Sequence, residues 1–122
     1  MKLHADRAGT HNVFTAYGEG FVAVNGERHA VNLVVLPDRV LPWDLADFDA
    51  LAETHFAALA ALGPEILLLG TGPRQRFPHP SLARPLAAAR IGLEVMDTQA
   101  ACRTYNVLVA EERRVAAALL LR

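Results

Sequence analysis

Residues 64–72 read PEILLLGTG, an apolar run of strand length that ends in two glycines around a threonine. A continuous apolar run is typical of a strand covered on both faces of a sheet, so a buried strand is expected over Glu65 to Leu69. Glycine tolerates positive φ and lets the backbone approach a ligand closely. Gly70, Thr71 and Gly72 are therefore the first candidate binding residues, at the C-terminal end of that strand.

A helix and a second strand are predicted after this stretch. Residues 81–90 favour a helix, although Pro85 either disturbs its first turns or marks where the regular helix starts. Residues 93–97 (LEVMD) then read as a strand. With residues 65–69 they predict a βαβ unit with parallel strands, so the loops after the two strands should open at the same edge of the sheet.

Short strands are predicted before this unit. Residues 13–17 and 21–24 are rich in aromatic and β-branched side chains, and Asn25-Gly26 is a strong type I′ hairpin signal that leads into another strand. The run Leu33 to Leu36 suits a strand covered on both faces, whereas residues 41–43 (LPW) favour a rigid connector. An N-terminal β-hairpin or meander is therefore expected.

Two further helices are predicted from their capping residues and side-chain spacing, one before Gly63-Pro64 and one near the C-terminal end of the sequence. Asp44 or Asp47 can cap the first, which Gly63-Pro64 would end. The residues that recur at helical spacing in this helix are Phe48, Leu51, His55, Leu59 and Leu62. Asp97 or Thr98 can cap the second. The face expected to pack on the sheet consists of Ala100, Thr104, Val107 and Leu108.

Size and composition indicate one compact domain over residues 1–122, without internal repeats or linkers. Hydrophobic residues make up 52% of the chain and the mean hydropathy is +0.20, which predicts a well-buried interior or an apolar face left for a partner. A second copy of the chain could be that partner, so homo-oligomerisation is one use of such an apolar face. Twelve basic and thirteen acidic residues give a net charge of -1, so no broad attraction for nucleic acid or anionic lipid is expected.

A cytoplasmic location is predicted from three features. The single cysteine, Cys102, cannot form an intrachain disulfide, which favours a reducing compartment. The first ten residues contain no apolar stretch of the kind that a signal peptide requires. The apolar tail over residues 115–121 covers only seven residues, and a transmembrane helix needs roughly 18.

The sequence around the glycines offers no catalytic constellation. A dinucleotide fingerprint or a Walker loop needs other spacing, so a simple structural turn is an open alternative to a ligand site at residues 70–72. Arg74, Arg76 and His79 follow in a proline-bounded loop, where the arginines would either supply charge to an anion or be solvated with Phe77 tucked beneath them. Arg74 is therefore a further candidate binding residue.

The last long helix carries other polar candidates. Arg103 and Asn106 share a face and could act together, although a structural hydrogen bond is the alternative role for Asn106. Cys102 would need a histidine base to act as a nucleophile, and an inert, half-buried thiol is expected instead. The histidines lack metal-ligand spacing, so neither a metal nor a cofactor is predicted. No catalytic residue is assigned, and the interpretation leans away from an enzyme.

The order of the motifs resembles a known family. An Asn-Gly hairpin is followed by Trp43 before a helix, PEILLLGTG, GLEVMDTQAACRTYNVL (92–108) and EERRVAAALLL (111–121). This order resembles the small proteins of the adipogenesis-associated Mth-like domain family, which are related to mitochondrial complex I assembly factor 3. The resemblance implies a three-layer α/β fold with a mixed central sheet. It also favours a strand over residues 115–121, where propensity alone favours a helix.

The resemblance implies a site but brings no catalytic mechanism. The site residues that it implies are Gly70, Thr71, Gly72, Thr104, Tyr105 and Asn106. Two functions are therefore left open. The first is a non-enzymatic protein-interaction or assembly module with an unidentified protein partner. The second is a binder of an anion or small molecule, either a binding protein or an enzyme, which uses backbone donors at residues 70–72 with charge from Arg74 or Arg103.

Overall fold

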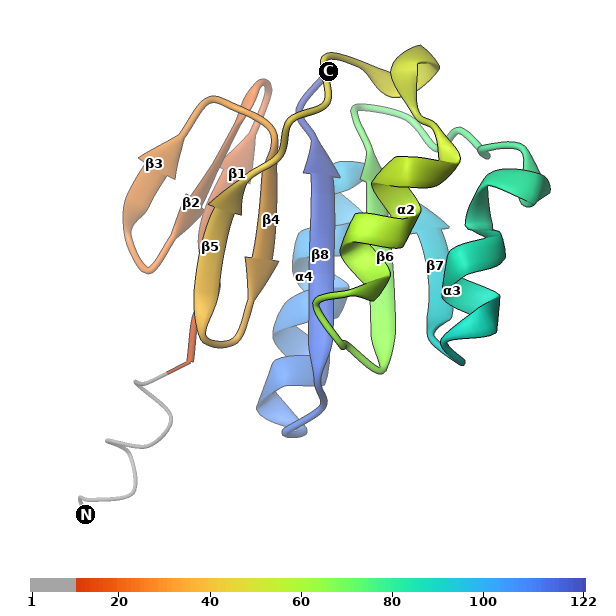
Figure 1. Ribbon diagram of the computed structural model, residues 1–122. Coiled ribbons are helices and arrows are strands. Elements are labelled where there is room, and N and C mark those ends of the chain that lie inside the picture. Colours follow the sequence, from red (N-terminus) through yellow and green to blue (C-terminus); the bar gives the residue numbers. More distant parts are fainter. Residues whose placement is uncertain (1–10) are drawn as a thin grey trace.

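The computed structural model describes residues 11–122, which form two β-sheets and several helices (Figure 1). The small sheet is antiparallel and has three strands in sequence order: β1 (Phe14–Gly18), β2 (Phe21–Val24) and β3 (Glu27–His29). The large sheet is mixed and has the strand order β5-β4-β8-β6-β7. Its strands are β4 (Leu33–Leu36), β5 (Arg39–Pro42), β6 (Ile66–Thr71), β7 (Gly92–Met96) and β8 (Val115–Leu120).

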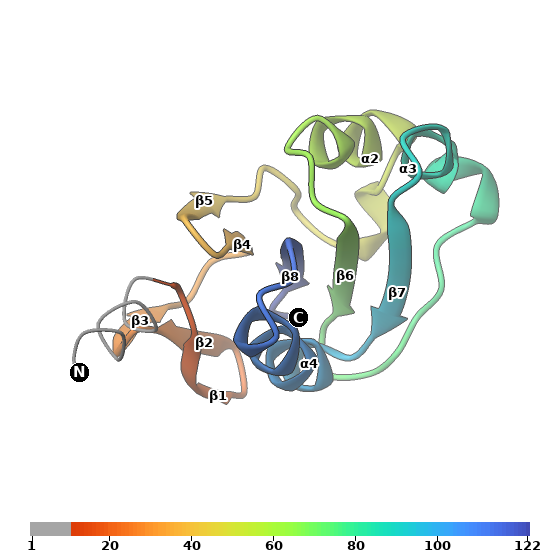
Figure 2. The same cartoon turned by 90° about the horizontal axis from the view of Figure 1, so that it is seen from below.

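The helices lie on both faces of the large sheet and give the molecule three layers (Figure 2). They are α2 (Glu53–Ala60), α3 (Arg84–Ala88) and α4 (Thr98–Ala110), with 3₁₀ turns at Phe48–Ala50 and Pro80–Ala83. Helices α2 and α3 cover one face, and α4 with the small sheet covers the other. The predicted three-layer α/β fold with a mixed central sheet is confirmed.

Strand β8 lies at the centre of the large sheet, where it pairs with β4 on one side and with β6 on the other. All six of its residues are buried. The small side chains of Ala116, Ala117 and Ala118 let the layers on both faces approach closely. The strand expected near the C-terminal end is therefore confirmed, because burial between two strands outweighs the helix propensity of alanine and leucine.

The predicted hairpin and βαβ unit are both present. Asn25 and Gly26 have φ values of 53° and 86°, as a type I′ turn requires, and they connect β2 to β3. Strands β6 and β7 are parallel, with Leu67 opposite Leu93. The intervening helix is shorter than predicted, since a 3₁₀ turn comes first and the regular α3 begins at Arg84.

Two predictions before β6 are wrong. The residues expected to be a connector, 41–43, instead contribute Leu41 and Pro42 to edge strand β5. The long helix expected from Asp44 or Asp47 is interrupted, because Leu51 has extended backbone (φ -57°, ψ 134°) and its side chain is buried. Helix α2 begins anew after this break, where the backbone N–H of Ala52 donates to Nδ1 of His55 at 3.0 Å.

The face of α4 that packs on the sheet also differs from the prediction. Its buried side chains are those of Ala101, Cys102, Tyr105 and Val109, together with Thr98. Val107, which was expected in the core, is 57% exposed. Two apolar rows adjoin on this helix, and the large ring of Tyr105 takes the interior position because it buries more apolar area.

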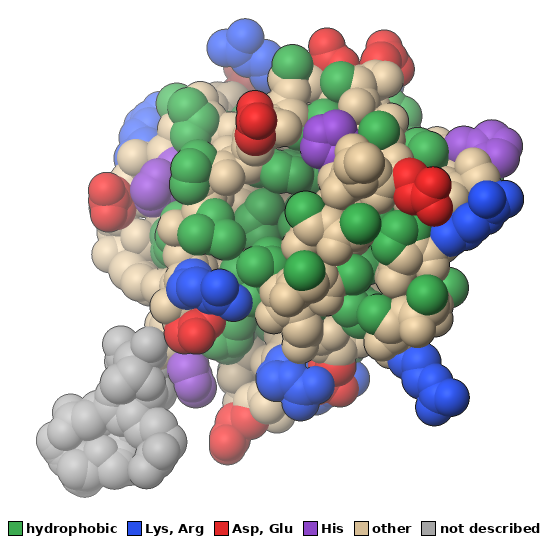
Figure 3. Space-filling model, viewed as in Figure 1, with side chains coloured by type: hydrophobic (Ala, Val, Ile, Leu, Met, Phe, Trp, Pro, Cys, Tyr) green, Lys and Arg blue, Asp and Glu red, His purple; other side chains and the backbone are tan. Residues whose placement is uncertain are grey.

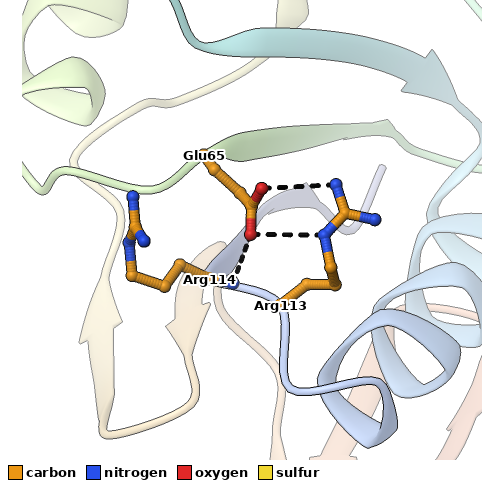
Figure 4. A network of polar contacts seen from close by, with 3 residues as sticks. All are labelled: Glu65, Arg113 and Arg114. Atoms are coloured by element: carbon orange, nitrogen blue, oxygen red, sulfur yellow. Dashed lines mark hydrogen bonds and ion pairs between the residues drawn. The ribbon is translucent and has the colours of Figure 1, made fainter.

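An ion pair joins the starts of β6 and β8, at the end of the large sheet where these two strands begin (Figure 4). Nε and Nη2 of Arg113 lie 3.2 and 3.3 Å from the carboxylate oxygens of Glu65, and the backbone N–H of Arg114 donates to Oε1 at 3.1 Å. The hydrogen bonds from Arg113 and Arg114 lower the pKa of Glu65 below its usual value of 4.5. This pair links the residues that precede the two parallel strands.

Candidate functional site

The glycines of the PEILLLGTG motif serve close packing at the end of β6. A Cβ on Gly70 would lie 2.8 Å from Cδ2 of Leu119 and 3.1 Å from Cα of Thr98, so the missing side chain lets α4 start directly on the sheet. Gly72 follows the strand with a φ of +94°. Its N–H donates to Oγ1 of Thr98 at 2.8 Å, and its carbonyl accepts from the N–H of Thr98 at 2.9 Å. The backbone donor of Gly72 is therefore already paired within the chain.

Thr71 organises the loop that follows. Its side chain is fully buried, and its hydroxyl donates to the carbonyl of Arg74 at 2.7 Å and accepts from the N–H of Arg76 at 3.0 Å. The guanidinium of Arg76 donates to the Thr71 carbonyl at 2.7 Å and lies over the ring of Phe48 at 4.6 Å. Arg76 is therefore part of the fold, not a solvated charge. Phe77, expected beneath it, is 70% exposed.

Tyr105 and Asn106 hold the small sheet on α4. The N–H of Phe14 donates to Oδ1 of Asn106 at 2.9 Å, and Nδ2 of Asn106 donates to the Phe14 carbonyl at 2.8 Å. The hydroxyl of Tyr105 donates to the carbonyl of Asn12 at 2.9 Å, and burial raises the pKa of Tyr105. The rings of Phe14 and Tyr105 meet edge to face, with centroids 5.0 Å apart. Asn106 thus makes structural hydrogen bonds, which was the alternative role considered for it from the sequence.

Arg103 lies one residue before Thr104 on the same helix but has a different environment. Nη1 of Arg103 lies 3.4 Å from the hydroxyl of Tyr17, and this hydrogen bond raises the pKa of the guanidinium. The Arg103 side chain is exposed, whereas that of Thr104 is half-buried. Arg103 is therefore the one exposed residue of the 103–106 segment.

A cleft of about 810 Å³ lies where the small sheet meets the C-terminal ends of β6 and β8. Its walls include the turn between β1 and β2 (residues 17–21) and the start of α4. Two of the predicted binding residues, Gly72 and Arg103, also line it, as does Pro73, which follows Gly72. The structure thus brings Gly72 and Arg103 together, while Gly70, Thr71, Arg74, Thr104, Tyr105 and Asn106 do not line this cleft. Tyr17 and Gln99 also line it. Sequence reasoning missed them because only the docking of the small sheet places Tyr17 beside α4.

A second surface lies between α2 and the β4–β5 hairpin, and we call it the α2–β5 groove. Among residues 11–122, no helix covers β4 and β5 on the face that α2 and α3 occupy (Figure 2). Apolar side chains gather on this face (Figure 3). The groove has a volume of about 330 Å³, and its apolar lining includes Val34, Leu41, Pro42, Trp43, Leu59 and Leu62. A further depression of about 300 Å³ adjoins it at Leu62. The sequence did not predict this groove because β5 was not predicted.

Other candidate chemistry is limited. Cys102 is fully buried, more than predicted, and burial raises its pKa to about 12. Such a thiol stays protonated and is a poor nucleophile. Across residues 11–122, no three His, Cys, Asp or Glu side chains are grouped so as to hold a metal ion. In the same part of the chain, no helix has the length and apolar character needed to cross a membrane.

Comparison with known proteins identifies relatives of this fold. The family model described as "Protein of unknown function (DUF498/DUF598)" matches residues 14–120. NADH dehydrogenase [ubiquinone] 1 alpha subcomplex assembly factor 3 of Xenopus tropicalis is 31% identical over 98% of this chain, which spans 66% of that protein. The 13 kDa major membrane protein of Francisella tularensis is 28% identical over 98% of this chain and 99% of that protein.

A solved structure agrees with these relatives. The solution structure of a Mth938-like domain from Bordetella pertussis matches with a TM-score of 0.81 at 39% identity, over 98% of this chain and 92% of that one. The matched region includes both sheets of the present fold, since the family model extends from β1 to β8. The chain therefore belongs to the DUF498/DUF598 family, as a Mth938-like domain related to complex I assembly factor 3.

Proposed function

We propose that the protein is a non-enzymatic interaction module of the assembly-factor kind, which binds a protein partner in the α2–β5 groove. The observation that carries the proposal is the apolar lining of this groove. Leu41, Trp43 and Leu62 are only partly buried there. They lie on the face of the large sheet that α2 and α3 cover elsewhere. The name of the Xenopus tropicalis relative, an assembly factor, supports the same class of function.

The groove has the composition of a protein-binding surface. Aromatic side chains supply much of the binding free energy of many interfaces, and the half-buried Trp43 lines this groove. Charged residues lie at its borders, with Asp44 at one end and Arg39 in the adjoining depression. An apolar centre with a polar rim is the usual anatomy of an interface. The proposal includes action in the cytoplasm, which the unpaired Cys102 suits.

Two arginine substitutions on α2 test the proposal. Ala58 is exposed and lines the groove, so Ala58→Arg fills it without removing a core side chain. Ala57 is exposed on the same helix but does not line the groove, so Ala57→Arg is the matched control. Affinity capture from the native host should recover a protein with the wild-type chain and with Ala57→Arg, but not with Ala58→Arg. Equal recovery with all three chains would contradict the assignment of this groove.

The cleft beside Arg103 favours a second candidate function, the binding of a small molecule. Its volume of about 810 Å³ lies within the range of small-molecule sites. The exposed guanidinium of Arg103 supplies a positive charge to a lining that also includes Glu19 and Asp97, whereas the N–H of Gly72 is already paired with Thr98. A thermal-shift screen of metabolites and anions should then find a stabilising compound. Its effect should be lost in Arg103→Gln and kept in Arg84→Gln, and a screen without any stabilising compound would reject this candidate.

A further inference from the structure

Acidic and basic residues are separated along the middle of this chain. Residues 41–64 contain four acidic residues, Asp44, Asp47, Asp49 and Glu53, and no lysine or arginine. Residues 66–93 contain four arginines, Arg74, Arg76, Arg84 and Arg90, and no aspartate or glutamate. The first segment includes one wall of the α2–β5 groove, and the second includes the loop after β6. The lining of the groove includes one acidic residue, Asp44, and the loop after β6 includes one exposed arginine, Arg74.

The loop over residues 73–80, which we call the Phe77 loop, presents one large apolar side chain to solvent. Phe77 is 70% exposed, the largest exposed fraction among the big apolar side chains of residues 11–122. Hydrogen bonds nevertheless hold the loop in place. The hydroxyl of Thr71 donates to the carbonyl of Arg74, and the guanidinium of Arg76 donates to the carbonyl of Thr71. Nε2 of Gln75 donates to the carbonyl of Val95 at 2.9 Å. Prolines on both sides of Phe77 restrict it further. An anchor that is already ordered loses little entropy when it binds.

The α2–β5 groove has the properties that such an anchor needs. Its apolar lining includes the half-buried Trp43 and Leu62, against which an aromatic ring can pack. Asp44 lies on its rim, and Glu53 is exposed in the first turn of α2. Arg74 is exposed in the Phe77 loop and could pair with the carboxylate of Asp44. Opposite charges around an apolar contact favour association and fix its orientation.

We propose that the chain associates with itself, with the Phe77 loop of one copy bound in the α2–β5 groove of a second copy. This inference rests on the proposed role of the groove as an interaction surface and names an occupant for it. The ring of Phe77 lies against Trp43 and Leu62 of the second copy, and Arg74 lies near Asp44. Each copy carries both surfaces, so the contact forms between identical chains.

Sedimentation velocity of the full chain tests this inference first. The wild-type chain should show a mass that rises with concentration. Phe77→Ser and Ala58→Arg should each weaken association at least tenfold, while Ala57→Arg should leave it unchanged. Arg74→Glu should also weaken association, and salt should weaken the wild-type contact because it screens the charges. Circular dichroism checks that each variant is folded, as expected for substitutions at exposed positions.

Mixing the two defective variants gives the decisive result. Phe77→Ser retains an intact groove, and Ala58→Arg retains an intact Phe77 loop. Neither should associate alone, but an equimolar mixture should form a complex of one copy of each. A monomeric wild-type chain, or a mixture that stays monomeric, would overturn the self-association. The capture experiment above would then still report separately whether another protein binds the groove.

Discussion

Gly70 shows how one missing side chain positions a whole helix. The first residue of α4, Thr98, packs directly over Gly70, and its hydroxyl links Gly72 to the carbonyl of Leu120. Thr98 thus ties the ends of β6 and β8 to the start of α4. The conspicuous glycines are therefore needed for packing, whether or not a ligand also approaches Gly72.

Gly70→Ala tests this role. The added Cβ would lie 2.8 Å from Leu119 and 3.1 Å from the Thr98 backbone, and overpacking of this kind costs about 1–3 kcal/mol. Thermal denaturation should show the loss of stability. Gly92→Ala is the matched control, because its Cβ would meet only the Glu65 carbonyl at 3.8 Å. If both variants melted together with the wild type, the packing role of Gly70 would be refuted.

Asn106 supports a second prediction at this scale. Asn106→Ala removes both side-chain bonds to Phe14 and leaves its backbone groups without their partner, at an expected cost of about 1–3 kcal/mol. Urea denaturation measures the loss, and hydrogen exchange at the Phe14 amide should become faster. Val107→Ala, at an exposed position of the same helix, should leave both quantities nearly unchanged.

At the scale of single elements, an ion pair links the starts of strands β6 and β8. Glu65 precedes β6 and accepts hydrogen bonds from Arg113 and Arg114, which precede β8. The folded-state pKa of Glu65 lies below its usual value of 4.5. A carboxylate with a lowered pKa stabilises the folded state at pH values above its unfolded pKa, and the stabilisation disappears as the pH falls through the folded pKa.

Glu65→Gln should therefore alter stability in a pH-dependent way. We expect the wild-type chain to be more stable than the variant well above pH 4.5, and the difference to shrink as the pH falls below that value. The effect should be small because both side chains are partly exposed and water screens the pair. Urea denaturation across this pH range measures it. A difference that stayed constant with pH would show that the charge of Glu65 is irrelevant.

At the scale of the whole molecule, the two sheets share one apolar core. Phe14, Val22 and Val24 of the small sheet pack with Leu33 and Val35 of the large sheet in the cluster that contains Tyr105. On the other face of the large sheet, a separate cluster lies beneath α2 and α3. The shared core predicts that the small sheet folds together with the large one, as a single domain would.

Phe14→Ala tests this coupling. Phe14 is 5% exposed, and loss of a buried phenylalanine side chain costs about 3–5 kcal/mol. Far-ultraviolet circular dichroism and near-ultraviolet signals should still change in one coincident transition, at lower denaturant. Separate transitions for the two signals would indicate that the small sheet unfolds on its own.

Local sequence determined the elements whose signals are short-range. Asn25-Gly26 specified its hairpin because only residues that accept positive φ fit a type I′ turn. The apolar runs at 33–36 and 65–69 specified buried strands, and the βαβ order specified that β6 and β7 are parallel. The strand over 115–120 came from the family resemblance, since alanine and leucine by themselves favour a helix.

Only the tertiary structure decided what depends on contacts between distant residues. Edge strand β5 forms because it pairs with β4, and α4 buries the row with Tyr105 because that ring meets Phe14, far away in the sequence. The candidate site was divided for the same reason: Gly72 and Arg103 share a cleft, while Tyr105 and Asn106 bind β1. Spacing along a chain gives the order of its elements, but the docking of one layer on another decides which side chains remain at the surface.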